Sequence, residues 1–86
     1  MDLAQAREIR SKLERIDEDT VMIEMINDAA AIVEEKGSIY IRVHDGDNNF
    51  KNNIVIPREG AGKVLDAIRQ HFVEHKNDLN REIEEM

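Results

Sequence analysis

Residues 38–57, SIYIRVHDGDNNFKNNIVIP, contain the signals that decide the fold class. From Ser38 to His44, isoleucine and valine alternate with other side chains, which is the period of a β-strand. A second apolar run, Ile54–Ile56, ends at Pro57, and Asp, Gly and Asn residues that favour turns separate the two runs. The stretch predicts an antiparallel β-hairpin over about residues 38–56.

The register of this hairpin depends on the length of its loop. Asp45–Gly46 alone is sufficient for a two-residue turn. A loop of about four residues instead sets Val43 opposite Phe50 and Ile39 opposite Ile54, which matches the apolar pattern better. We expect the longer loop, with the apolar face of the hairpin packed on the helix that follows. The residues of this predicted contact are Ile39, Ile41, Val43, Phe50, Ile54 and Ile56 on the hairpin, and Leu65, Ile68 and Phe72 on the helix.

Two helices are expected before the hairpin. Apolar residues recur at threes and fours from Leu3 to Ile16, so a helix is predicted over about residues 3–16. The next apolar set, from Met22 to Val33, would lie on nearly the opposite side of a continuous helix. We therefore predict a break at residues 17–20 and a second helix over about residues 20–36. The alternative is one long helix whose two halves contact different partners.

One helix is expected after the hairpin, over about residues 60–85. Its first half is apolar enough to cover the hairpin, whereas His75–Met86 is mostly charged. The sparse apolar stripes at the two ends of the chain are expected to pair, either antiparallel with each other or with their copies in a homodimer. The predicted self-association residues are Leu3, Ile9, Leu13, Ile16, Leu79, Ile83 and Met86.

Together these elements predict an α+β fold in one small domain spanning residues 1–86. The expected order is α-α-β-β-α, with the antiparallel β-hairpin packed against the helices. A lone hairpin is marginally stable and leaves both strand edges open, so a homodimer that extends the sheet is slightly favoured.

Composition excludes several classes of function. The chain has no cysteine, which rules out disulfides, thiolate nucleophiles and cysteine zinc sites and fits a cytoplasmic location. Its longest apolar stretch, Ala29–Val33, is far too short for a membrane span. A formal net charge of −7 argues against direct binding to nucleic acid. The basic run from Arg7 to Arg15 is interrupted by Glu8 and Glu14, so a direct nucleic-acid regulator is the weaker hypothesis.

The sequence contains three partial motifs, and none predicts catalysis, a metal or a cofactor. His71–His75 has the H-x-x-E-H spacing of a zinc peptidase, but no third ligand is evident. Residues 45–49 match the start of a calcium loop that then lacks its glycine and its bidentate glutamate. Residues 60–63 lack the first glycine and the Ser or Thr of a phosphate-binding loop. We therefore expect no enzyme activity.

Carboxylates at helical spacing are the remaining functional signal. Glu24, Asp28 and Glu35 fall within about 40° on a helix, and neighbours about 6 Å apart approach the spacing of phosphates along a nucleic-acid strand. The predicted partner-binding residues are Asp17, Glu24, Asp28 and Glu35, with a second row of Glu74, Asp78 and Glu85. This pattern predicts an acidic protein-interaction module, a nucleic-acid mimic that occupies a basic surface of a partner such as a nucleic-acid-binding enzyme.

Short, acidic, cysteine-free chains of this kind are found among inhibitors made by phages and mobile elements, anti-CRISPR proteins included. This is a similarity of size and charge and not of motif. The alternative hypothesis is a homo-oligomeric assembly module that uses the apolar stripes of the N- and C-terminal helices.

Overall fold

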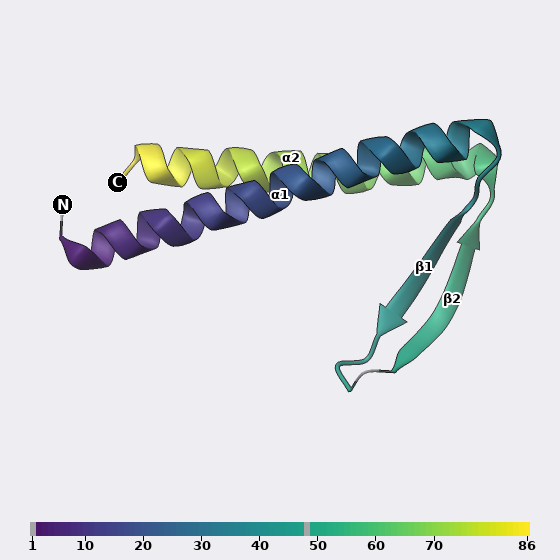
Figure 1. Ribbon diagram of the computed structural model, residues 1–86, viewed down its shortest axis with the longest axis horizontal. Coiled ribbons are helices and arrows are strands. Elements are labelled where there is room, and N and C mark those ends of the chain that lie inside the picture. The colour runs from purple at the N-terminus through teal and green to yellow at the C-terminus, as the bar shows by residue number, and fades with distance from the viewer. Residues whose placement is uncertain (1, 48) are drawn as a thin grey trace.

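The protein folds into two long antiparallel helices joined at one end by a β-hairpin (Figure 1). The computed structural model describes residues 2–47 and 49–86, and within the second strand it describes the backbone but not the side chains of residues 51–53. The order of elements is α1 (Leu3–Glu35), β1 (Ile39–His44), β2 (Phe50–Ile56) and α2 (Arg58–Glu84). The α+β class and the antiparallel two-stranded sheet are confirmed. The order α-α-β-β-α is correct only in part, because the first two predicted helices are a single one, the alternative that the sequence left open.

Helix α1 runs for 33 residues without a break. It begins with a capping box, in which the Asp2 carboxylate accepts a hydrogen bond from the Gln5 backbone at 2.8 Å and the Gln5 side chain accepts one from the Asp2 backbone. At the predicted break, Thr20 Oγ1 donates to the Ile16 carbonyl at 2.9 Å, a bond within the helix. Asp19 does not cap a new helix, because its side chain is buried against α2.

The contact between α1 and α2 follows a seven-residue spacing on both helices. Near the chain ends, Lys12 Nζ lies 3.0 Å from Glu82 Oε2. Seven residues further along each helix, Asp19 Oδ2 lies 2.6 Å from His75 Nδ1. The same spacing continues toward the hairpin through apolar pairs of positions. These are Ile26 and Val33 on α1 and Ile68 and Ala61 on α2, all within one apolar cluster. We call this contact the seam; it is polar near the termini and apolar near the hairpin.

The hairpin register differs from the predicted one. Ile39 pairs with Ile56 and Ile41 with Ile54, and a bulge then brings His44 opposite Phe50. Val43 therefore does not face Phe50, because the loop spans residues 45–49 and β2 contains one extra residue. Asp45 closes this loop, accepting from the Asp47 N–H at 2.8 Å and donating its own N–H to the Asn49 carbonyl. Gly46 has φ of 91°, a conformation that favours glycine.

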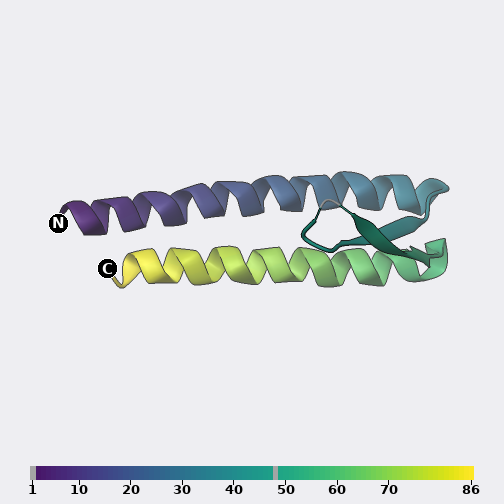
Figure 2. The same ribbon diagram turned by 90° about the horizontal axis from the view of Figure 1, so that it is seen from below.

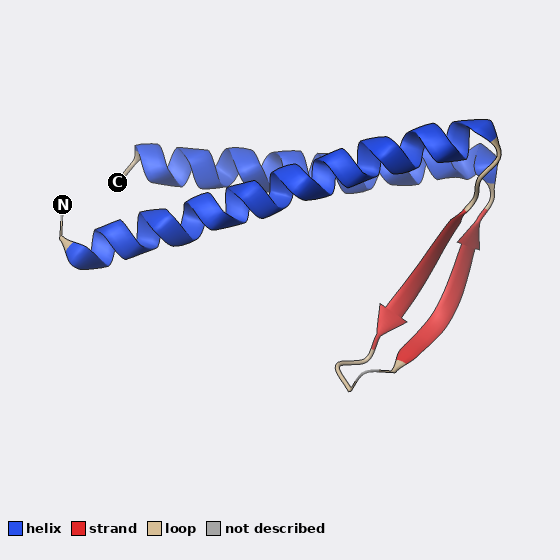
Figure 3. Ribbon diagram, viewed as in Figure 1, coloured by secondary structure: helices blue, strands red, loops and turns tan. Residues whose placement is uncertain are grey.

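The predicted packing of the hairpin on the helices is correct only at its base. Ile39 and Ile56 contact the apolar cluster of the seam, together with Ile68 and Phe72. Val43, Phe50 and Ile54 are exposed, because the strands leave the helical pair at an angle and project into solvent (Figure 3). Seen from below, most of the length of each helix has no strand beside it (Figure 2).

Candidate functional site

The continuity of α1 aligns four exposed carboxylates on the side of the helix away from α2. Asp17, Glu24, Asp28 and Glu35 fall within about 40° around the helix axis, and we call them the acidic row. None of the four side chains forms an ion pair with another residue that the structure describes. Arg58 approaches only the backbone here, donating from Nη1 to the Glu35 carbonyl at 2.9 Å. The row is therefore free to attract cations from outside the chain.

The whole excess charge of the protein lies in this half of α1. Residues 17–35 contain seven acidic side chains and no lysine or arginine. The rest of the chain is balanced, with twelve acidic and twelve basic residues. No basic residue occupies the last turn of α1, where the helix dipole favours a cation. Like charges one turn apart and acids at the C-terminus both disfavour the helix, so helix stability does not explain this arrangement.

An exposed apolar stripe lies beside the acidic row. Val21, Met25 and Ile32 are 51%, 58% and 67% exposed, and they lie about 60° around the axis from the centre of the row. We call the row and this stripe together the outer face of α1. Large apolar side chains gathered on one face are typical of a protein interface, and methionine adapts readily to different partners.

Apolar periodicity did not predict this stripe, because it grouped Met22 and Met25 with Ile26 and Val33, which are buried. In the structure both methionines are exposed. A signal that identifies the outer face is present in the sequence. A spacing of seven residues runs from Val33 and Ile26 back to Asp19 and Lys12. This spacing places polar residues in the seam and leaves the methionines outside it.

The second predicted acidic row, on α2, is partly neutralised. Arg81 Nη2 donates to Asp78 at 3.1 Å, and the Gln70 amide donates to Glu74 at 3.1 Å. Glu85 is exposed beyond the end of the helix. Glu74 and Asp78 lie on α2 and Glu85 lies just beyond it, so none of the three adjoins the acidic row along α1.

The predicted self-association residues lie partly inside the seam. Ile16 and Leu79 are buried there, and Ile9 and Ile83 are half-buried. The stripes at the two ends of the chain thus pair with each other in one molecule, which is one of the two arrangements the sequence left open. The members of the set that stay exposed are Leu3, Leu13 and Met86.

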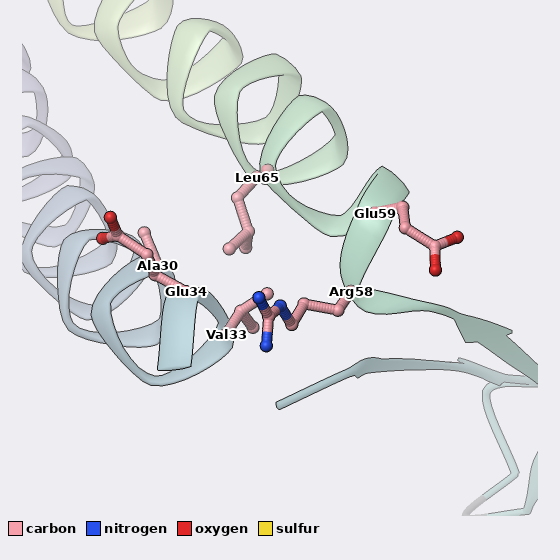
Figure 4. Close-up of a pocket in the computed structure, with 7 residues that line it drawn as sticks. Ala30, Val33, Glu34, Arg58, Glu59 and Leu65 are labelled. Carbon is pink, nitrogen blue, oxygen red and sulfur yellow. The ribbon is translucent and has the colours of Figure 1, made fainter. Parts of the chain in front are cut away.

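A shallow groove of about 400 Å³ lies between the end of α1 and the start of α2 (Figure 4). Ala30, Val33 and Leu65 form its apolar part. Charged residues line the remainder, but the Arg58 guanidinium is engaged by the Glu35 carbonyl, and the Glu59 carboxylate points away from Leu65.

The histidines of the H-x-x-E-H motif lie at the seam or beside it. His75 is bonded to Asp19, and its ring stacks on that of His71 at 6.3 Å between centroids. His71 also contacts the ring of Phe72 edge-on at 5.2 Å. Over residues 2–47 and 49–86 there is no group of three or more potential ligands that could hold a metal ion. Neither of the described helices is long and apolar enough to cross a membrane.

Comparisons with protein-family models, with curated proteins and with solved structures found no match for this chain.

Proposed function

We propose that this protein is a non-catalytic interaction module that docks the outer face of α1 on a basic surface of a partner protein. It acts by occupying that surface, such as the nucleic-acid groove of a nucleic-acid-binding enzyme. The observation that carries the proposal is the acidic row, four exposed carboxylates along one face of α1 with no ion pair to the described part of their own chain.

The apolar stripe supports a protein as the partner, in preference to small cations. Val21, Met25 and Ile32 would lose their exposed area against apolar side chains, while the row meets lysines or arginines beside them. The size and charge of the chain favour an inhibitor of the kind made by phages and mobile elements. Under this proposal the protein acts in the cytoplasm, where such enzymes work.

Removal of the row is expected to abolish capture of the partner. The variant Glu24→Gln/Asp28→Asn/Glu35→Gln and the unchanged protein are each immobilised and exposed to a cell lysate containing nucleic-acid-binding proteins. The unchanged protein should retain basic proteins that duplex DNA displaces, and retention should fall as salt rises. The variant should lose this retention while unfolding in urea at the same or a slightly higher concentration, because like-charge contacts are relieved.

A matched control separates the row from total charge. Glu18→Gln/Glu59→Gln/Glu84→Gln also removes three negative charges, but from exposed positions outside the row. This control should retain the same proteins as the unchanged chain. If row and control variants behave alike, or if the row variant retains the same proteins with the same salt dependence, the proposal is wrong.

A further inference from the structure

The hairpin is the least covered element of the molecule. Beyond its base, Tyr40 is 67% and Phe50 64% exposed, and Val43, Ile54 and Val55 are each about half exposed. The Phe50 ring lies against two residues of the hairpin itself, with the His44 ring 5.2 Å away and the Arg42 guanidinium 5.7 Å from its centroid. A two-stranded hairpin without a third strand or a covering helix is marginally stable in water. The projecting part of the hairpin therefore lacks the contacts that would hold it.

The surface area of one chain indicates how large a missing contact is. A compact protein of 9.9 kDa exposes about 5,200 Å², whereas this chain exposes 6783 Å². The excess is about 1,600 Å², while a specific interface of ordinary size covers about 800 Å² on each partner. The excess is enough for one full interface at the hairpin and leaves area for the outer face of α1.

Charge favours a second copy of this chain as the occupant. Residues 39–56 contain two basic and two acidic residues, so the hairpin is neutral within a chain of charge −7. Two copies meeting through helices would bring acidic surfaces together. Meeting through the neutral, apolar hairpins keeps those surfaces apart and lowers the repulsion.

The two strand edges differ in their readiness to pair. Strand β2 contains the bulge, a feature that protects an edge from pairing. Strand β1 is regular over Ile39–His44, contains no proline or lysine and is rich in β-branched residues. The outer edge of β1 is the one open to another strand.

We propose that two copies pair through β1, antiparallel about a two-fold axis at Ile41, to form a four-stranded sheet in the order β2-β1-β1-β2. In this register Ile41 faces Ile41 and Ile39 faces Val43 of the other copy, so the apolar face becomes continuous. The neighbouring registers centre on Tyr40 and Arg42. The first pairs only residues 39–41 of β1, and the second sets two guanidinium groups opposite each other, which is unfavourable. The interface uses no residue of the outer face of α1, so it stands independently of the proposed function.

Single cysteines test this register directly, because the chain has none of its own. Cysteines facing each other across antiparallel strands have Cα atoms about 4.5–5.5 Å apart, within the range of a disulfide. Under mild oxidation Ile41→Cys should form a disulfide-linked dimer in high yield, whereas Val55→Cys, on the other strand, should stay largely unlinked. Equal linkage of both variants, or none at Ile41→Cys, would overturn the proposal.

Mass in solution provides the second readout. Sedimentation of the unchanged protein should give twice the chain mass of 9.9 kDa. Ile41→Lys places two ammonium groups against each other and should give a monomer, while Val55→Lys should remain a dimer. Circular dichroism monitors the helices of both variants, so that loss of the dimer is separated from loss of the fold. A monomeric unchanged protein, or a dimer in Ile41→Lys, contradicts the pairing.

Discussion

Met25 and Ile26 are adjacent in α1, yet the structure gives them opposite environments. Ile26 is buried in the apolar cluster of the seam, and Met25 is exposed on the outer face. Ile26→Ala should cost about 2–4 kcal/mol of unfolding free energy, since it leaves a cavity. Met25→Ala should change stability by less than about 0.5 kcal/mol but weaken capture of the partner. Urea unfolding and the capture experiment measure the two effects.

This pair of substitutions also tests the rotation of α1 about its axis. Were α1 turned so that the methionines faced α2, the larger loss of stability would follow Met25→Ala. That outcome would also remove the apolar stripe from the proposed interface.

Lys12 and Asp19 explain why the sequence predicted a break that is absent. Apolar periodicity cannot predict that a lysine and an aspartate lie in the seam. Their partners, Glu82 and His75, lie 70 and 56 residues away in the sequence, so no local signal marks them. At this scale the alignment of Glu24, Asp28 and Glu35 could be predicted from helical spacing, whereas the place of Asp17, which depends on the continuity of α1, and the apolar stripe could not.

At the scale of elements, the hairpin, its turn and the last helix were predictable because their signals are local. Alternation, turn residues and Pro57 lie within a few positions of the structure they specify. The register of the hairpin was not predictable, because it depends on a bulge, and bulges leave no fixed pattern in sequence. The hairpin contacts the apolar cluster through Ile39 and Ile56 at its base, a long-range contact that no local signal predicts.

The pairing of α1 with α2 should depend on pH through Glu82. The hydrogen bond and charge of Lys12 hold the pKa of the Glu82 carboxyl below its usual range. A carboxyl with a lowered pKa in the folded state stabilises the fold above its unfolded pKa, and this stabilisation is lost as pH falls through the folded value. We expect urea stability to fall below about pH 4.5, the region where a glutamate normally titrates, and less steeply in Lys12→Met.

Low pH acts on the whole chain, so the comparison between variants carries this test. Glu8→Gln serves as the control, because Glu8 lies farther from Lys12, at 3.8 Å, and is exposed. Its pH profile should follow that of the unchanged protein. Identical profiles for Lys12→Met and the unchanged protein would show that the Lys12 and Glu82 contact does not stabilise the pairing.

For the whole molecule, the concentration of charge in residues 17–35 makes salt act in opposite directions on the two proposed contacts. Salt screens the repulsion between two acidic chains, so the dimer should tighten between low and moderate ionic strength. Binding of a basic partner should weaken over the same range, because there the charges attract. Sedimentation and capture at matched salt concentrations measure both effects, and a dimer that dissociates as salt rises would contradict pairing through the neutral hairpin.

Both chain ends lie together at the end of the helical pair opposite the base of the hairpin, in a molecule 51 Å long (Figure 1). The protein is consequently a natural spacer. A fluorophore, bead or affinity handle joined to either terminus is held well away from whatever grips the strands. Handles at one end and strands at the other make the chain suitable for attachment to a surface through its termini.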